Sequence, residues 1–449
     1  MARMFGTDGV RGVANTELTV EKAMALGKAG ARVLTGGVNR PLFVIGKDTR
    51  ISGDMLEDAL CAGIMSMGGD VIKAGVIPTP GIAYLVRKYQ ADAGVVISAS
   101  HNPYPFNGIK FFNSEGLKLE DAVEDAIEDI VTGRTPAGEP VPSEGLGRVQ
   151  IPPVPPLQEY KEYVKSTFGD TLEGMKIVLD CANGASAVAA GDIFRELGAE
   201  TTVLAQEPDG ININEKCGST HPEHLAEEVV RRKADLGLAF DGDADRLIAV
   251  DEKGAVIDGD RLIYMIAKYM QEQGRLKDDI VTVTVMTNVG FHRKAKDLHF
   301  HVDVTSVGDR YVLESMLKTG GLIGGEQSGH IILREFSTTG DGMVAALQLL
   351  KAYKYYGIPL SELAGELVIY PQVMVNAAVA NEHKEAYKND PEITALIRAA
   401  EEQLQDTGRV LIRPSGTEPL VRVMLEGENT EELQTMAQEI ADLIEKKSK

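Results

Sequence analysis

Two short loops carry the side chains whose types and spacing predict chemistry. In the first, Asp241, Asp243 and Asp245 alternate with small residues directly after the apolar run Leu236–Phe240. Three carboxylates at positions i, i+2 and i+4 repel one another unless a cation lies between them. Hard oxygen ligands favour Mg²⁺ or Ca²⁺ over a metal that prefers thiolates. The alternative is an acidic surface turn, but such a turn rarely follows so apolar a strand, and the spacing predicts a cation site.

The second loop is Ser98-Ala99-Ser100-His101-Asn102-Pro103, which follows the apolar run of residues 94–97. A run of valine and isoleucine is typical of a strand buried on both faces, and Asn-Pro indicates a turn. Open α/β sheets bind ligands at the carboxyl ends of such strands, where Ser100 would lie. A Ser-His pair alone is more often a turn cap than a nucleophile. Ser100 becomes a candidate because other loops, and Lys110 shortly after it, supply partners.

Basic residues must be concentrated locally if this chain binds phosphate, because its net charge is −21. That charge disfavours non-specific nucleic-acid binding and repels an anionic substrate at long range. The segment 413–419 combines hydroxyl groups, a glycine and charged donors between two expected strands, which favours a phosphate site over a plain hairpin turn. Its candidate donors are Arg413, Ser415, Gly416, Thr417 and, on the following strand, Arg422.

Three further loops carry polar groups. Residues 326–330 combine a carboxylate, an amide, a hydroxyl and an imidazole, a set that suits recognition of sugar hydroxyl or amino groups. His330 is also a candidate general acid or base, since the pKa of histidine lies near neutrality. Residues 5–12 place three glycines around Arg11, whose guanidinium would fit phosphate oxygens, although a plain glycine turn is the simpler interpretation. For residues 307–311, structural and functional interpretations are equally open.

The elements that position these loops recur along the chain. A buried strand ends in a small polar loop three times, and about 40–60 residues later a second buried strand ends in a more elaborate loop. The first strands are at 44–46, 177–179 and 281–285, and the later loops are at 98–101, 241–246 and 325–330. This pattern predicts three α/β units of one design that present three loops from equivalent strand ends. If the units pack around a shared cleft, the loops meet there. Residues 367–375, 409–412 and 420–425, with two helices, predict a smaller α+β unit.

With 449 residues the chain is too long for one hydrophobic core. We expect four domains, at residues 1–150, 151–256, 257–366 and 367–449. The proline- and glycine-rich stretch 132–156 predicts a stiff linker at the first boundary. The sequence contains no apolar run long enough to span a bilayer, and its three scattered cysteines form no disulfide or metal pattern. We therefore expect no membrane contact and a reducing cytoplasm.

Taken together, these loops resemble those of the α-D-phosphohexomutase superfamily, and the resemblance extends over the whole chain. It rests on residues 5–12, 98–103, 218–223, 325–330 and 413–419. The resemblance implies an α/β fold with three related domains of mixed sheet flanked by helices, plus a smaller C-terminal α+β domain, around a central cleft. Within the superfamily, the motifs are most similar to those of bacterial enzymes that interconvert glucosamine-6-phosphate and glucosamine-1-phosphate, in the synthesis of UDP-N-acetylglucosamine and cell-wall precursors. A phosphoglucomutase or phosphomannomutase is the close alternative, because only the amide of Gln327 favours glucosamine.

The resemblance also implies roles for individual residues. Ser100 would be a phosphoserine, and its phosphate would hold Mg²⁺ together with Asp241, Asp243 and Asp245. A hexose 1,6-bisphosphate would be the intermediate, and the enzyme would be a homodimer. The phosphate that is not transferred would be bound by Arg413, Ser415, Gly416, Thr417 and Arg422; sugar hydroxyls by Glu326 and Ser328; and the transferred group by Lys110, Arg11 and His330, with Arg246 in the same catalytic set.

Two departures from the superfamily pattern remove no ligand: Lys47 stands where many relatives have arginine, and Ala244 where many have glycine. Two other classes of protein fit less well. A Mg²⁺-dependent phosphatase with an aspartyl nucleophile leaves Ser100 and residues 413–419 without a role. A non-catalytic sugar-phosphate-binding protein would be expected to have lost Ser100 or one of the three aspartates.

Overall fold

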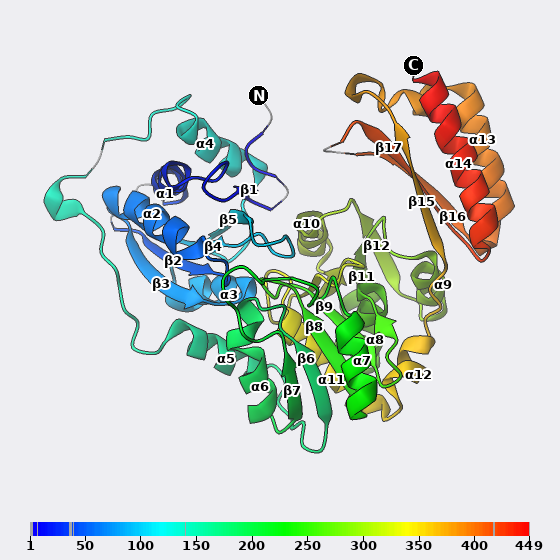
Figure 1. The fold of residues 1–449 in the computed structure, drawn as a ribbon, viewed down its shortest axis with the longest axis horizontal. Coiled ribbons are helices and arrows are strands. Elements are labelled where there is room, and N and C mark those ends of the chain that lie inside the picture. Colours follow the sequence, from blue (N-terminus) through cyan, green and yellow to red (C-terminus); the bar gives the residue numbers. More distant parts are fainter. Residues whose placement is uncertain are drawn as a thin grey trace. The chain divides into compact units, whose positions relative to one another are not determined.

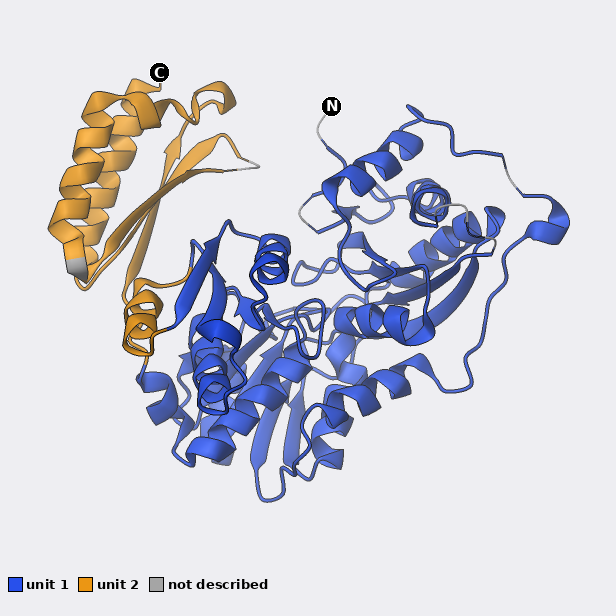
Figure 2. Cartoon of the chain, turned by 180° about the vertical axis from the view of Figure 1, so that it is seen from behind, with its two compact units in different colours: residues 1–286, 300–366 blue, residues 287–299, 367–449 orange. Residues whose placement is uncertain are grey.

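The computed structural model describes residues 3–6, 8–35, 38, 40–139, 141–415 and 418–448. The chain forms two compact units: residues 1–286 with 300–366, and residues 287–299 with 367–449 (Figure 1; Figure 2). Within the described residues, the first unit contains three β-sheets flanked by helices, and the second contains one. In the described part of the chain, no helix combines the length and the apolar character needed to cross a membrane.

The three sheets of the first unit are mixed. The first has the order β1-β5-β4-β2-β3, the second β10-β9-β8-β6-β7, and the third β12-β11-β13-β14. Their strands are β1 (Val10–Val13), β2 (Leu42–Lys47), β3 (Asp70–Val76), β4 (Ala93–Ile97), β5 (Phe106–Asn113), β6 (Lys176–Asp180), β7 (Glu200–Leu204), β8 (Leu236–Phe240), β9 (Leu247–Asp251), β10 (Val256–Ile257), β11 (Ile280–Thr284), β12 (His301–Thr305), β13 (Ile323–Gly325) and β14 (Ile331–Leu333).

The predicted repeat is confirmed by the strand pairing. Each sheet contains the same four neighbours, β3-β2-β4-β5, β7-β6-β8-β9 and β12-β11-β13-β14. In each set the first three strands are parallel and the fourth is antiparallel. The elaborate loops at 98–101, 241–246 and 325–330 all connect the third strand of a set to its antiparallel neighbour. They therefore leave equivalent strand ends.

The central strands form because their sequences are apolar throughout. All five residues of β4 and all five of β8 are buried, as expected for strands covered by helices on both faces. The helices of the first unit are α1 (Val20–Leu34), α2 (Gly53–Ser66), α3 (Thr79–Tyr89), α4 (Asp121–Val131), α5 (Pro156–Ser166), α6 (Ala190–Glu196), α7 (Glu223–Arg232), α8 (Gly259–Glu272), α10 (Asp309–Thr319), α11 (Gly342–Tyr356) and α12 (Leu360–Gly365).

The proline- and glycine-rich stretch differs from a free linker. Val71 of the edge strand β3 donates its N–H to the carbonyl of Arg148, and Gln150 donates its N–H back to Val71. The carboxylate of Asp70 also accepts hydrogen bonds from the backbone of Arg148 and the side chain of Gln150. Residues 148–150 therefore lie along β3 and cover part of an edge that would otherwise expose unpaired backbone groups. The domain boundaries at 150/151, 256/257 and 366/367 stay predictions, and the second of them falls within β10.

The second unit is a small antiparallel sheet with helices, as the sequence predicts. Its strands β15 (Gln372–Ala378), β17 (Leu420–Glu426) and β16 (Arg409–Pro414) are neighbours in that order, and β15 begins later than the expected residue 367. Helices α13 (Pro391–Leu404) and α14 (Thr430–Lys447) pack against this sheet through a core of buried aliphatic side chains (Figure 2). Helix α9 (Val289–Asp297) also belongs to this unit, although it lies between β11 and β12 in the sequence.

Candidate active site

The loops that follow β4, β8 and β13 meet in the first unit. The hydroxyl of Ser100 donates a hydrogen bond of 2.6 Å to Oδ2 of Asp241. From the third loop, Nε2 of His330 lies 3.8 Å from Oδ2 of Asp245, and the backbones of Arg246 and His330 form a β-bridge. Ser100 and Asp241 are 2% and 1% exposed, so this contact is almost completely shielded from bulk water. The structure thus brings together three loops that lie far apart in the sequence.

The three aspartates have the chemistry of a divalent cation site. Asp241, Asp243 and Asp245 are buried, and each offers one carboxylate oxygen within 4.8 Å of the others. Across the described chain, Oδ1 of Asp243 and Oδ1 of Asp245 are buried and have no hydrogen-bond partner. Buried carboxylate oxygens without donors are costly unless a cation binds them. The donor set therefore fits a hard cation such as Mg²⁺.

Neighbouring cations neutralise the charges of these three carboxylates to different degrees. Burial, followed by the charges of Asp245 and Asp243, raises the pKa of Asp241 well above its ordinary value. Burial and the neighbouring Asp243 likewise raise the pKa of Asp245. Burial also opposes ionisation of Asp243, but Lys110 outweighs it and lowers the pKa of that carboxyl. Asp243 therefore has the closest cation of the three, whereas the nearest guanidinium to Asp241 and Asp245, that of Arg246, is 3.9 Å away from each.

Lys110 connects the cluster to the N-terminal loop. Its Nζ lies 2.8 Å from Asp243 and 2.7 Å from Asp8, and the side chain is only 2% exposed. Arg11 also pairs with Asp8, at 2.7 Å. Lys110, Lys118 and Arg11 overcome the effect of burial and hold the pKa of Asp8 well below its ordinary value. Two of the predicted catalytic cations, Lys110 and Arg11, therefore lie around one carboxylate, next to the aspartates.

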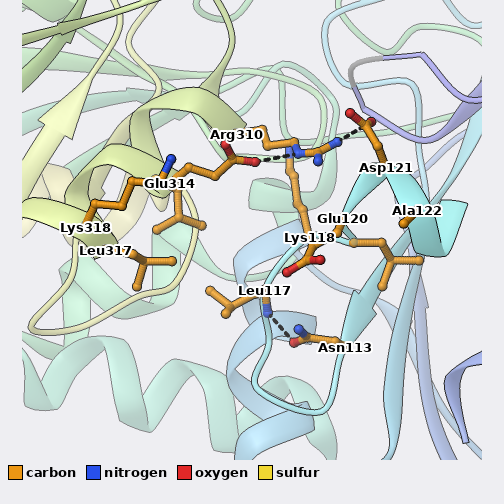
Figure 3. A pocket seen from close by; sticks show the side chains of 12 residues that line it. Asn113, Leu117, Lys118, Glu120, Asp121, Ala122, Arg310, Glu314, Leu317 and Lys318 are labelled. Carbon is orange, nitrogen blue, oxygen red and sulfur yellow. Dashed lines mark hydrogen bonds and ion pairs between the residues drawn. The ribbon is translucent and has the colours of Figure 1, made fainter. Parts of the chain in front are cut away.

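Sequence reasoning missed Lys118, which completes this network. Its Nζ lies 2.6 Å from Asp8 and 2.5 Å from Asp309, and Asp309 in turn lies 3.3 Å from Nε2 of His330. The lysine lines a pocket of about 580 Å³ between the β5–α4 connection and α10, where Arg310 pairs with Asp121 (Figure 3). No local motif marks Lys118, because its partners lie 110 and 191 residues away.

Replacing Lys118 by methionine is expected to destabilise the first unit. The substitution leaves Asp309 without its lysine partner, whereas Asp8 keeps Lys110 and Arg11. Removing one partner of a buried ion pair costs about 3–5 kcal/mol. We expect a lower urea midpoint and a lower melting temperature. Lys318→Met is the matched control, because Lys318 lines the same pocket, is exposed and forms no ion pair among the described residues. Equal effects of the two substitutions would contradict the role given to the Asp8–Lys118–Asp309 bridge.

In the loop predicted to bind the sugar, some of the polar side chains already form contacts within the protein. The carboxylate of Glu326 accepts a hydrogen bond of 2.9 Å from the backbone N–H of Gly308, and Ser328 is exposed. The amide of Gln327 lies 3.5 Å from Oδ2 of Asp258, which caps α8. Gln327 thus has a contact within the protein, so its amide alone does not argue for glucosamine.

The predicted phosphate loop lies in the second unit. Arg413 of β16 and Arg422 of β17 stand directly opposite each other, an arrangement of like charges that is unfavourable unless an anion lies beside them. Glu418 pairs with Arg422 at 3.0 Å, so Arg413 is the arginine that an external anion would serve most. Burial, and then the charge of Arg422, lowers the pKa of Arg413. Ser415 is buried, its hydroxyl accepts a hydrogen bond from the N–H of Glu418, and its carbonyl accepts one of 2.7 Å from Lys384. Gly416 and Thr417, which belong to the same prediction, lie outside the described residues.

Comparison with protein families matches four successive parts of the chain. Residues 2–137, 158–254 and 258–370 match the models described as phosphoglucomutase/phosphomannomutase alpha/beta/alpha domains I, II and III. Residues 374–443 match the phosphoglucomutase/phosphomannomutase C-terminal domain.

The chain is similar over its whole length to curated enzymes. Phosphoglucosamine mutase of Clostridium novyi (strain NT) is 56% identical over 449 residues, which are 100% of each chain. That of Caldicellulosiruptor bescii is 55% identical over 449 residues, or 99% of each chain.

Solved structures show the same fold. A phosphoglucomutase/phosphomannomutase family protein from Burkholderia thailandensis matches with a TM-score of 0.82 at 23% identity, covering 99% of this chain and 97% of that one. Aspergillus fumigatus N-acetylphosphoglucosamine mutase, in complex with GlcNAc-6P and magnesium, matches with a TM-score of 0.71 at 16% identity, covering 99% and 96%.

Proposed function

Because the chain belongs to the phosphoglucosamine mutases of the phosphoglucomutase/phosphomannomutase family, we propose that it interconverts glucosamine-6-phosphate and glucosamine-1-phosphate. The enzyme is an isomerase, and the proposed route uses a phosphoserine and a 1,6-bisphosphate intermediate. The observation that carries this route is the 2.6 Å hydrogen bond from Ser100 to Asp241, which puts a hydroxyl at the edge of a three-carboxylate site.

Phosphoryl transfer depends mainly on positioning and on neutralising charge. In the proposed cycle, O1 of a 6-phosphosugar attacks the phosphorus on Ser100; the bond from phosphorus to Oγ breaks and a 1,6-bisphosphate forms. After the sugar has turned over, Oγ of Ser100 attacks the 6-phosphate and the serine is phosphorylated again. The product is the 1-phosphosugar, and the phosphate count of the enzyme is unchanged.

Asp241, Asp243, Asp245 and the phosphate on Ser100 would hold Mg²⁺, which supports the transfer by neutralising charge on the phosphoryl group. The three buried carboxylates support this assignment. Magnesium and GlcNAc-6P accompany the related Aspergillus enzyme, and another structure of that enzyme contains glucose 1,6-bisphosphate.

The cations of the network would act on the transferred group. Lys110 and Arg11 lie beside Asp8 and would move onto phosphate oxygens when substrate binds. Arg246, whose Nε lies 3.9 Å from both Asp241 and Asp245, would serve the same group. His330 would exchange a proton with the sugar hydroxyl, oriented by Asp309 at 3.3 Å.

The remaining site residues would bind the sugar and the phosphate that is not transferred. Glu326 and Ser328 would contact sugar hydroxyl groups, and the opposed arginines of β16 and β17 favour a phosphate there. The proposed ligands of that phosphate are Arg413, Ser415, Gly416, Thr417 and Arg422. We also propose that the enzyme works in the cytoplasm, which its three free, buried cysteines support, as a homodimer that supplies UDP-N-acetylglucosamine synthesis.

The substrate assignment is tested by a coupled assay with glucosamine-6-phosphate, glucose-6-phosphate and mannose-6-phosphate at saturating Mg²⁺. We expect kcat/KM to be highest for glucosamine-6-phosphate, by at least about tenfold, because a site that binds a charged amino group loses that contact with a hydroxyl analogue. If kcat/KM were highest for glucose-6-phosphate or mannose-6-phosphate, the proposed substrate would be wrong, but the proposed mechanism would still stand. Gln327→Ala should leave the ranking unchanged, since its amide contacts Asp258.

A further inference from the structure

Two side chains that the sequence did not single out hold the backbone of the Ser100 loop. Arg50, shortly after β2, has a side chain with 0% exposure. Its guanidinium donates hydrogen bonds to the carbonyl oxygens of Ser100 at 2.9 Å, Asn102 at 2.7 Å and Pro103 at 2.7 Å. Asn214, from the chain segment between β7 and β8, donates from Nδ2 to the carbonyls of Ser100 at 2.9 Å and Asn102 at 3.1 Å. The carbonyl of Ser100 therefore has one donor from each of two neighbouring α/β repeats.

The loop needs this restraint because of its backbone conformation. Ser100 has a φ of 51°, in the left-handed region that a residue with a Cβ rarely adopts. Such a conformation persists only where the surroundings hold it. The carbonyl of Ser100 also lies against Gly242, where an added Cβ would be 2.5 Å from the oxygen. These contacts fix the carbonyl of Ser100 and, with the backbone, the direction of the Cα–Cβ bond that carries Oγ.

Arg50 is itself held in place by Asp48, a residue of its own loop. Its Nε pairs with Oδ2 of Asp48 at 2.9 Å, and its backbone N–H donates to Oδ1 of the same carboxylate. Asp48 also accepts a hydrogen bond from the hydroxyl of Ser98, and that hydroxyl accepts one from the N–H of Ser100 at 2.9 Å. The N–H and the carbonyl of Ser100 are thus tied to one buried set of polar groups.

We propose that Arg50 and Asn214 are positioning residues for phosphoryl transfer, which hold the Ser100 backbone so that Oγ faces Asp241. Neither side chain contacts Oγ, so both act through the two carbonyls they share. Because Asn214 belongs to the second repeat and Ser100 to the first, the geometry of the nucleophile depends on how these two repeats pack. The inference rests on the proposed function, since it assumes that Ser100 carries the phosphate.

Asn214→Ala tests the inference, with Asn212→Ala as its matched control. Asn212 lies in the same loop, and among the described residues its side chain forms hydrogen bonds only with the backbone of Glu207 and Asp209. We expect Asn214→Ala to lower kcat by about 10- to 100-fold, because a small displacement of a reacting group has an effect of this size. KM for the 6-phosphosugar should change by less than about twofold, since no substrate contact is lost. The Mg²⁺ concentration for half-maximal activity should rise, because the phosphate on Ser100 is a proposed ligand.

Arg50→Lys is the second variant. Lysine keeps the charge but replaces a planar fork that reaches three carbonyls by a single ammonium group. Arg50→Lys should likewise lower kcat while leaving KM nearly unchanged, a result that a merely structural role would not produce. The inference would be overturned if Asn214→Ala had the same kcat and KM as the wild type. It would also be overturned if the loss of activity matched the unfolded fraction seen by circular dichroism. Intact mass of the wild type keeps the two proposals apart: absence of a phosphate on Ser100 overturns the proposed function, whereas a phosphorylated, active wild type with unaffected variants overturns only the positioning role.

Discussion

Ser100→Ala is expected to lower kcat by at least about 1,000-fold, because the substitution removes the atom that accepts and donates the phosphoryl group. The fold should persist. Alanine and serine have similar access to the backbone conformation at φ 51°, and the hydrogen bonds from Arg50 and Asn214 go to the carbonyl, which the variant keeps. The protein should also lose the mass of one phosphate.

The measurement is intact mass before and after incubation with a hexose 1,6-bisphosphate, followed by the coupled assay. Ser114→Ala is the control, because Ser114 is an exposed serine of the same α/β repeat, in the turn after β5. It should keep both the phosphate and the activity of the wild type. Turnover by Ser100→Ala at the wild-type rate would exclude the phosphoserine route, and a phosphate still present on that variant would place the modification elsewhere.

Asp241→Asn and Asp243→Asn are expected to have the same effect on metal binding and opposite effects on the metal-free protein. Either substitution removes a charged ligand, so the affinity for Mg²⁺ should fall by at least about 100-fold. Without metal, Asp241 lies close to two other carboxylates, and its neutralisation should raise the melting temperature. Asp243 instead accepts hydrogen bonds from Nζ of Lys110 at 2.8 Å and from the hydroxyl of Thr79 at 2.7 Å. Its neutralisation should therefore destabilise the metal-free folded state by about 2 kcal/mol.

Thermal unfolding in EDTA and in increasing Mg²⁺ separates these effects. Mg²⁺ should raise the melting temperature of the wild type, because it binds the folded state, and should leave both variants nearly unchanged. The pair of variants serves as each other's control, since both make the same chemical change two residues apart. A lower melting temperature for both variants in EDTA would contradict the unequal compensation of the carboxylates.

The raised pKa values of Asp241 and Asp245 add a pH dependence to the metal-free protein. Above the ordinary aspartate pKa of about 4, the folded state holds protons on these groups that the unfolded chain has released. Their contribution to stability is therefore present at low pH and is lost as pH rises through the folded pKa values. Asp241→Asn should reduce this dependence, measured as melting temperature in EDTA across pH. Protons and Mg²⁺ compete for the same oxygens, so metal affinity should fall as pH falls.

The sequence by itself determined the repeated design and the main functional loops. The strands β4 and β8 are continuous apolar runs that end in small polar residues, and this local pattern is enough to predict both a buried strand and the loop at its carboxyl end. The three aspartates are predictable for the same reason, since their spacing lies within five residues. The equivalence of the three sheets also follows from strands and loops that recur in order.

The tertiary structure alone decided how these loops are joined. Lys110 pairs with Asp243, 133 residues away, and Asn214 reaches the carbonyl of Ser100 across 114 residues. Lys118 has no motif, yet it bridges two buried carboxylates. A pattern along the chain reports whether a side chain is apolar or charged, and in which direction a regular element turns it. It does not report which charge from another repeat lies within 3 Å, because that depends on how three sheets pack and on the free energy of burying each charge with a partner rather than alone.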